Sequence, residues 1–580
     1  MKSIKYRIMI IICSVLLILA GSQHLLNAQD DPLIEALSDE MERASDNLRL
    51  EDEAPPYFLG YLANLEDNCR IRAEYGSIVE CDCQEANQMF LDLRVGDYEF
   101  DNTNVMTSFF GVGMATANLP VEIAYIPLRK EAWLQIDETY KRAVETIAQK
   151  RAMLQSIIPD DTVSDLSKAE VVIDLKPDVD AQVDTTEWKE TLAAMSAVFK
   201  NYPQFTRSSV QLNTKTENRY VLNSEGTRVK RGRHVHYLFI EASTLDTKGI
   251  PVYEYDRIVV DDLDDFPSRD ELVQWADDFA QTSAAMVDAE TTDTYIGPVL
   301  FTPRASAQLL SQLFVDNISN PRKPLTMDNR FDQYLTDARL VRKLNFRIMP
   351  EFISFVDDPT MMEYNGLELK GYYEFDDQGV LAERITLVED GKLRNYYMSR
   401  TPTAKIKKSN GHGRLTQSRI GAVEIVGKPG NVIMQSTETY KSEELKQQMI
   451  EMCREMDLEY GLIIDRMNFS GRSNPDEGMR FRTAGGGEVP RVIVAYKVSA
   501  EDGSLTPIRS LEFDNINERA LKDILAVGDD FEETTIMFDA AFNNLASIVV
   551  PSILFEEMEL KKASLQAKKQ PIVLSPLERE

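Results

Sequence analysis

Residues 352–391 read FISFVDDPTMMEYNGLELKGYYEFDDQGVLAERITLVEDG, and this stretch carries most of the information about the fold. It holds three runs rich in apolar and β-branched residues, separated by turn-forming Asp, Pro and Gly. The pattern predicts consecutive strands at Phe352–Val356, Leu369–Phe375 and Ala382–Val388. Asp357 and Asp358 precede a proline, which is typical of a turn, although two neighbouring carboxylates are also the residue types of an acid pair for hydrolysis.

Strands also dominate the residues that follow. The runs Gly421–Ile425, Val492–Val498 and Ser510–Phe513 have strand composition, and Ser442–Met456 alone has the apolar spacing of a helix. Cys453 adjoins the apolar stripe of that helix, so we expect it to serve packing.

The first half of the chain mixes both patterns. Helical spacing predicts helices at Asp31–Leu48, Lys130–Ile157 and Trp188–Phe199, and another that carries Leu272, Trp275 and Phe279. Short alternating runs predict one strand meander over Tyr57–Val95 and a second over Ser208–Val260. We therefore predict an α+β protein of two domains: residues 29–295, an α/β unit with antiparallel sheets and helices, and residues 296–580, mainly antiparallel β.

The first 28 residues have the layout of a signal peptide. Lys2, Lys5 and Arg7 precede an apolar run, Ile8–Ala20, and a polar stretch that ends at Ala28. The run is shorter than the roughly 20 residues that span a bilayer. We expect cleavage near Ala28, export to the periplasm or the medium, and no membrane span afterwards.

The charge of the chain limits its possible partners, and its cysteine content bears on disulfide pairing. The chain has 64 Lys and Arg against 95 Asp and Glu, and so acidic a surface repels phosphate backbones, which argues against nucleic acid as a partner. Cys69, Cys81, Cys83 and Cys453 follow the signal segment. In an oxidising compartment Cys69 can pair with Cys81 or with Cys83, and the sequence leaves this choice open.

Several stretches together resemble the TldD/PmbA metallopeptidase family, whose paired forms are TldD and TldE. They are LRVGDYEFDNTN at 93–104, the segment 356–377 quoted above, NGHGR at 410–414 and VPSILF at 550–555. The similarity implies the family's two-domain fold, with a C-terminal domain of the TldD/PmbA type.

Catalytic members of that family carry His-Glu-x-x-x-His on a helix. Two imidazoles bind one Zn²⁺ and the carboxylate activates the metal-bound water. In the matching helix, Arg304–Asn317, the apolar neighbours place Ser311, Gln312 and Asp316 at the three motif positions. A serine hydroxyl is a poor zinc ligand and an amide takes no proton from water. No cysteine follows Cys453 to act as a later ligand, so no metal is expected on this chain.

Other candidate residues are few. The family's glycine-rich loop corresponds to Asn410, Gly411, His412, Gly413 and Arg414. We interpret it first as a solvated loop tip, and the alternative is a mobile loop that contacts peptide over a cleft, because glycines permit close backbone approach to a ligand. His234 and His236 share one face of a strand, and because Arg231 and Arg233 flank them we interpret them as surface histidines.

The leading hypothesis is an exported TldE-like subunit without its own zinc. It would pair with a zinc-bearing TldD-like homologue in a heteromer and help to hold unfolded peptide for the partner to cleave. The first alternative is an active metallopeptidase whose atypical site combines Asp316 with residues distant in sequence. The second is a non-catalytic peptide-binding or scaffold protein of the cell envelope.

Overall fold

The computed structural model describes residues 31–577 except 51–52, 108–112, 157–162, 182, 293, 320–321, 327–337, 419–420, 468–491, 515, 540–541, 543, 570, 572 and 574. The predicted signal peptide lies outside the described residues. Among the helices of the described part, none is long and apolar enough to cross a membrane.

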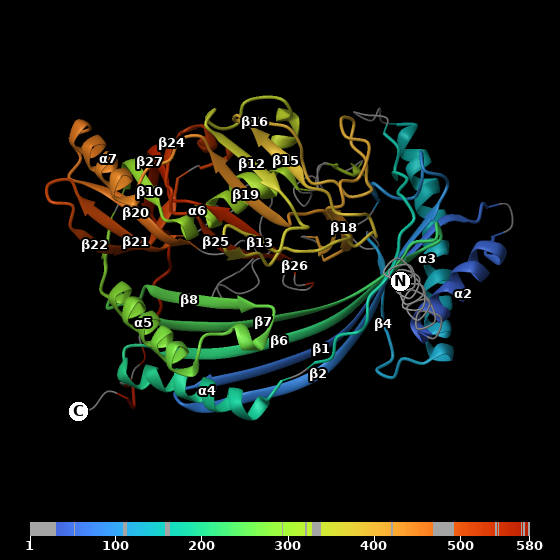
Figure 1. Ribbon diagram of the computed structural model, residues 1–580, viewed down its shortest axis with the longest axis horizontal. Coiled ribbons are helices and arrows are strands. Elements are labelled where there is room, and N and C mark those ends of the chain that lie inside the picture. The colour runs from blue at the N-terminus through green and yellow to red at the C-terminus, as the bar shows by residue number, and fades with distance from the viewer. Residues whose placement is uncertain are drawn as a thin grey trace, which may run out of the picture.

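The first domain is built on one long, curved and mostly antiparallel sheet (Figure 1). Its strand order is β4-β2-β1-β6-β7-β5, and β8 also pairs with β7. The bounds are β1 Pro56–Glu74, β2 Ser77–Val95, β4 Ala115–Asn118, β5 Ile173–Leu175, β6 Arg207–Asn223, β7 Arg228–Leu245 and β8 Pro251–Val260. The second predicted meander is confirmed as β6, β7 and β8.

The first predicted meander is wrong in detail, because β1 and β2 form a single hairpin of two 19-residue strands. A tight turn joins them at Tyr75 and Gly76, both with positive φ. The polar middle of β1 stays in the sheet because β6 supplies partners for it: Arg219 bonds Asn64 at 3.0 Å and Lys215 pairs with Glu66 at 2.7 Å.

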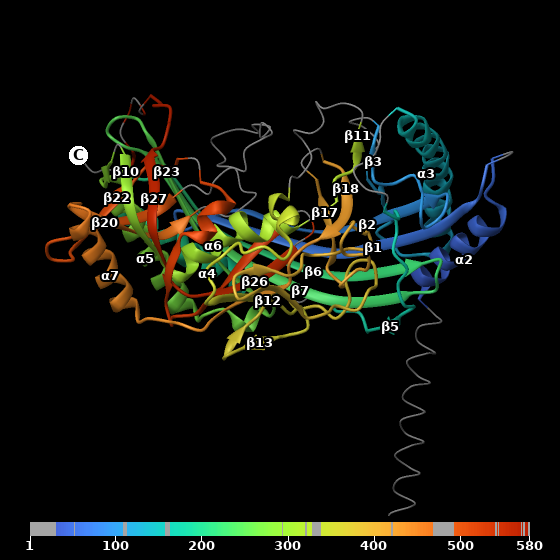
Figure 2. The same ribbon diagram turned by 90° about the horizontal axis from the view of Figure 1, so that it is seen from above.

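Helices cover the sheet on the face turned away from the second domain (Figure 1). Apolar side chains of α4 (Thr185–Ala197) and α5 (Arg269–Val287) form one core with those of β6 and β7. A separate core lies under α2 (Pro32–Asn47) and α3 (Tyr125–Leu154), at the end of the sheet that the second domain leaves uncovered (Figure 2). The four predicted helices of this half are confirmed.

The described part of the second domain contains two large sheets, with strand orders β23-β27-β10-β20-β21-β22-β9 and β16-β15-β12-β19-β26-β25, and β24 pairs with β27. The first sheet comprises β9 Glu290–Thr291, β10 Thr294–Phe301, β20 Tyr460–Met467, β21 Val492–Ser499, β22 Leu505–Arg509, β23 Leu511–Phe513, β24 Ile524–Val527 and β27 Ile553–Lys562. The second comprises β12 Ile353–Asp357, β15 Ile385–Glu389, β16 Lys392–Leu393, β19 Asn431–Ser436, β25 Glu532–Asp539 and β26 Asn544–Val550. Most pairs are antiparallel, as predicted.

Two longer helices complete this domain. Helix α6 (Pro303–Leu310) packs against strands of both sheets, and α7 (Ser442–Glu455) covers β10 and β20. The predicted strand Leu369–Phe375 is absent from the sheets: it is an irregular segment whose N–H groups bond side chains, Lys370 to Ser547 and Gly371 to Asn431. A short hairpin, β17 (Gly413–Gln417) with β18 (Val423–Gly427), extends from this domain toward the long sheet.

The cysteines of the described residues have different roles. Cys69 and Cys83 face each other across the β1–β2 hairpin and form a disulfide, which decides the pairing that the sequence left open. Cys81 is free and exposed, and Cys453 is fully buried in the core under α7, as expected.

Candidate functional site

The helix at the family's zinc motif has an unusual end. After α6 the chain makes a π-helical turn, η3 (Ser311–Val315), and the N–H of Asp316 donates to the carbonyl of Ser311 five residues earlier. Such i→i+5 turns bring residues five apart to the same side of the helix, and they often occur at functional sites. The backbone therefore has a geometry that suits ligands at positions 311 and 316.

The side chains at these positions do not suit zinc. Ser311 is fully buried and donates to the carbonyl of Gln308 at 2.8 Å, and the amide of Gln312 donates to the same oxygen at 3.3 Å. Asp316 adds a single carboxylate. No group of three or more His, Cys, Asp or Glu able to hold a metal occurs among the described residues. This helix therefore does not supply the set of side-chain donors that a zinc ion needs.

The segment 410–414 is neither a solvated tip nor a mobile flap over a cleft. His412 is 0% exposed, with Nδ1 at 2.9 Å from the carbonyl of Asn410 and Nε2 at 3.4 Å from Asp357. Asp357 also accepts the N–H groups of Gly430 and Asn431. Its contacts are those of a buried turn, in agreement with the turn prediction and not with an acid pair. Within the segment, Arg414 lines a cavity.

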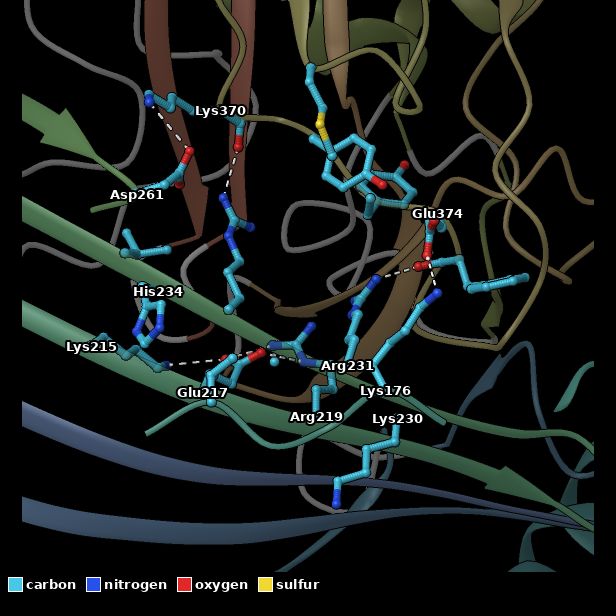
Figure 3. Close-up of a pocket in the computed structure, with 18 of the residues that line it drawn as sticks. Lys176, Lys215, Glu217, Arg219, Lys230, Arg231, His234, Asp261, Lys370 and Glu374 are labelled. Atoms are coloured by element: carbon cyan, nitrogen blue, oxygen red, sulfur yellow. Dashed lines mark hydrogen bonds and ion pairs between the residues drawn. The ribbon is translucent and has the colours of Figure 1, made fainter. Parts of the chain in front are cut away.

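That cavity, of about 850 Å³, lies between the two domains. Its walls come from β6 and β7 on one side, and from 368–375 and β17 on the other (Figure 3). Lys215, Glu217 and Arg219 alternate along β6 and so project from one face of the sheet, opposite Arg231 and Arg233 on β7. The irregular path of 369–375 places its backbone and aromatic rings against these charges.

One buried carboxylate organises the inner wall. Asp377, 0% exposed, accepts from Arg219 at 2.7 Å and from Arg231 at 2.6 Å, and Arg414 lies 3.5 Å away. Burial alone would raise the pKa of Asp377, but the three guanidinium groups outweigh burial and hold this pKa well below its usual range. These contacts join a strand pair of the first domain to a turn of the second.

The arginines of this wall carry more positive charge than their carboxylates neutralise. Burial lowers the pKa of Arg231 to about 10 in spite of Asp377, and Arg219 and Arg414 lower it further by repulsion. Arg233 lacks a carboxylate within hydrogen-bond distance among the described residues and donates to the carbonyl of Lys370 at 2.8 Å. Burial lowers the pKa of this group as well.

The two strand histidines differ from the surface interpretation. His234 and His236 do share one face of β7, and their rings stack 5.8 Å apart. His234 lines the cavity, but His236 is buried, and burial followed by repulsion from His234 lowers its pKa to about 4. A surface role is therefore wrong for His236, which is 4% exposed.

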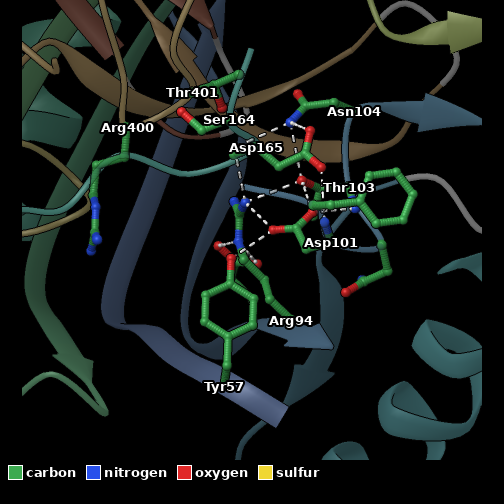
Figure 4. Close-up of polar contacts among 12 residues, drawn as sticks. Tyr57, Arg94, Asp101, Thr103, Asn104, Ser164, Asp165, Arg400 and Thr401 are labelled. Atoms are coloured by element: carbon green, nitrogen blue, oxygen red, sulfur yellow. Dashed lines mark hydrogen bonds and ion pairs between the residues drawn. The ribbon is translucent and has the colours of Figure 1, made fainter. Parts of the chain in front are cut away.

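The family-like stretch 93–104 lies elsewhere and forms a buried polar network (Figure 4). Arg94 donates to Asp101 at 3.1 Å, and Asn104 donates to Asp165 at 3.1 Å. Lys150 of α3 contacts Asp165 at 2.5 Å. The network ties β2 to α3, so this stretch has a structural role in the first domain.

Local sequence patterns do not predict the cavity, because its walls come from segments that are distant along the chain. A signal was present: charged residues at alternate positions inside two long strands, 215–219 and 231–233, are costly unless they face a polar space.

Comparison with known proteins gives a family match over the second domain. Residues 292–562 match the family model described as the PmbA/TldA metallopeptidase C-terminal domain. A protein of Archaeoglobus fulgidus described as a metalloprotease is 34% identical over 84 residues, which are 14% of this chain and 18% of that protein. The chain thus matches about a fifth of the length of that relative.

Solved structures share the fold over nearly the whole chain. TldE of Thermococcus kodakarensis superposes with a TM-score of 0.53 at 16% identity, covering 87% of this chain and 97% of the other. A Thermotoga maritima protein named as a candidate modulator of DNA gyrase gives 0.57 at 15%, covering 91% and 100%. A Bacteroides thetaiotaomicron protein of similar description gives 0.52 at 15%, covering 90% and 98%. At such identities the likeness shows the fold.

Proposed function

The chain belongs to the TldD/PmbA family, and from this premise we propose that it is an exported, TldE-like subunit that binds no zinc and acts with a zinc-bearing TldD-like partner. One observation carries the proposal: the helix that holds the family's zinc motif has Ser311 and Gln312 at motif positions, both bonded to Gln308 of the same helix. A chain without these ligands needs another chain for metal-dependent cleavage.

The role we propose for this chain is to bind unfolded peptide while the partner cleaves it. The cavity between its domains has a volume within the usual range of ligand sites, and its wall combines charges with aromatic rings. Peptide binding also agrees with the metallopeptidase name of the matched family model.

Co-expression with a TldD-like homologue from the same genome tests the proposal. We expect a stable heteromer that cleaves an unfolded peptide such as reduced casein, with about one zinc per heteromer, and no cleavage by this chain alone. The partner with its His-Glu-x-x-x-His glutamate replaced by glutamine is the control. Stoichiometric zinc in the isolated chain, with chelator-sensitive cleavage, would contradict the subunit role in favour of an atypical metal site.

A heteromer that forms but never cleaves would also contradict the catalytic part of the proposal. It would favour the peptide-binding scaffold of the cell envelope, because this alternative requires the fold and the cavity but no chemistry. Location is tested separately: periplasmic fractionation and N-terminal sequencing should find a mature chain that begins after Ala28.

A further inference from the structure

The inner end of the cavity contains buried hydrogen-bond donors that have no acceptor. Arg414 is 3% exposed, and its Nη1 has no hydrogen-bond partner among the described residues. Tyr373 is 4% exposed and its hydroxyl likewise has none there. Buried polar groups are almost always paired, so each orphan needs an explanation such as a bound ligand.

These two donors come from neighbouring side chains. The Arg414 guanidinium lies 4.4 Å from the centre of the Tyr373 ring, and both residues line the cavity. The remaining contacts of Arg414 hold it in position: Nη2 donates to Asn544 at 3.0 Å, and Nε lies 3.5 Å from Asp377. The guanidinium is therefore fixed, with one N–H edge left for a ligand.

Cationic side chains gather around this place. Four guanidinium groups, those of Arg219, Arg231, Arg233 and Arg414, line the wall, and the carboxylates paired with them are Glu217 and Asp377. Among the described residues, Arg233 and Nη1 of Arg414 have no carboxylate within hydrogen-bond distance, and a buried charge without a partner is costly.

The acidic residues that line the same cavity are at its mouth. The side chains of Asp261, Glu368 and Glu374 are 47%, 70% and 47% exposed. The side chain of Arg414 is 3% exposed and that of Arg231 is 21% exposed. The labelled residues of Figure 3 show the same order, with Asp261 and Glu374 on the side away from β6 and Arg219 on β6 itself. Solvated acids at the mouth do not neutralise the inner arginines.

We propose that this cavity is a carboxylate-binding site, in which Arg414 and the Tyr373 hydroxyl donate to the carboxylate and Arg233 supplies charge. Guanidinium and carboxylate groups have matching planar geometry, and hydrogen bonds to an ionised acceptor are among the strongest in proteins. The carboxylate site is inferred from geometry alone. That the carboxylate belongs to a peptide, at its C-terminus or on an acidic side chain, rests on the proposed function.

A variant that removes only the orphan hydroxyl tests the site. Tyr373→Phe deletes no hydrogen bond seen among the described residues, so the variant should fold with unchanged or higher thermal stability. It should weaken carboxylate binding roughly tenfold. Tyr61→Phe is the matched control, because Tyr61 is also buried with an unpartnered hydroxyl but lies in the core under α2 and α3.

Four labelled hexapeptides, measured by fluorescence anisotropy on the full chain without a partner, identify the source of the carboxylate. They combine a free or amidated C-terminus with an internal Glu or Gln. Tighter binding of the free-terminus pair assigns the site to the peptide end. Tighter binding of the Glu pair assigns it to an acidic side chain. Equal affinity of all four peptides, or Tyr373→Phe binding as tightly as Tyr61→Phe, overturns the proposal.

Glutarate, titrated calorimetrically without peptide or partner, separates this inference from the function on which it builds. Glutarate binding that Arg233→Gln weakens, in a chain that forms no heteromer, retains the carboxylate site and refutes the subunit role. A heteromer that cleaves peptide, together with no glutarate binding, retains the subunit role and refutes the site.

Discussion

At the scale of single residues, the strongest constraints are charges enclosed at the junction of the domains. Glu254 of β8 is 3% exposed, and one of its carboxylate oxygens has no partner among the described residues. Burial raises its pKa to about 8, although the nearby Arg466 opposes the shift. The group is therefore protonated at neutral pH and ionises within the range in which enzymes are assayed.

We predict that Glu254 makes the fold less stable as the pH rises. Its folded pKa exceeds that of an unfolded glutamate, so its stabilising contribution is complete below about pH 4.3 and is lost as the pH rises through 8. Glu254→Gln should therefore gain about 1–3 kcal/mol over the native chain at pH 8.5 and little at pH 4.5. Thermal melts across this pH range measure the effect; an equal effect at both ends would disprove it.

A second prediction concerns Arg400, which is fully buried between the domains. It pairs with Glu225 at 2.6 Å and donates twice to the carbonyl of Ser167. Arg400→Ala should cost about 3–5 kcal/mol, because it removes a fully buried guanidinium with its ion pair to Glu225 and leaves the carbonyl of Ser167 without these two hydrogen bonds. Arg400→Lys should recover only part of this, since an ammonium group cannot reproduce the planar fork.

Urea denaturation measures both Arg400 variants. Arg269→Ala is the control, because its pair with Glu190 is exposed on both sides, at 51% and 67%, and should contribute roughly 0–1 kcal/mol. Equal losses of stability in Arg400→Ala and Arg269→Ala would show that the buried pair does not stabilise the contact between the domains.

At the scale of elements, the sequence pattern correctly predicted the helices and strands that are determined by interactions between residues close along the chain. The helices and the β6–β8 meander appear where apolar periodicity and turn residues indicated them, because each buries a continuous face. The β1–β2 hairpin was predicted as shorter pieces, since its polar middle depends on Lys215 and Arg219 more than 140 residues away. Leu369–Phe375 has strand composition, but its N–H groups bond side chains instead of a neighbouring strand.

The candidate site was predictable only in part. Its family-like residues led to Arg414, and the family pattern also directed attention to Ser311, Gln312 and Asp316. Tyr373 and Arg233 were not found, because their role depends on distant strands that meet only in the folded chain. An exposed position was expected for His412 from its two flanking glycines, yet those glycines serve close packing.

Gly411 shows this packing and gives a third prediction. It has a φ of +70°, and a Cβ there would lie 2.1 Å from the carbonyl oxygen of Leu381. Gly366, in the exposed turn between β13 (Glu363–Tyr364) and β14 (Leu367–Glu368), has a φ of +82° and nothing within 4 Å of such a Cβ. Gly366→Ala should cost about 1–2 kcal/mol from conformation alone, and Gly411→Ala should cost more, because a steric clash is added. Matched denaturation curves compare them, and equal costs would refute the packing role.

At the scale of the whole molecule, ion pairs and shared apolar clusters hold the two domains against each other. Asp377 is the central example, since its arginine partners Arg219 and Arg231 belong to the first domain. Its lowered pKa means that its contribution is complete above about pH 4 and is lost as the pH falls further.

A fourth prediction follows for the pair of domains. Asp377→Asn should destabilise the chain by about 3–5 kcal/mol at pH 7, because three arginines lose their shared partner. The difference from the native chain should shrink as the pH falls below 4, because the unfolded native chain then takes up a proton at Asp377 that the folded state, with its lowered pKa, does not bind. Thermal scans at pH 7 and pH 3 test both parts; a loss that is independent of pH would assign the effect to packing.

The π-helical turn at Ser311–Val315 bears on whether metal ligands can be introduced at the positions that we align with the zinc motif. Ser311 occupies a closed core position, so a histidine there would add a ring where no volume remains, and overpacking of this kind typically costs about 1–3 kcal/mol. Restoring the metal ligands one at a time would therefore lower stability before any metal could be bound. The backbone of the turn has the spacing for two ligands, while the full burial of Ser311 disfavours the larger side chain that would supply one of them.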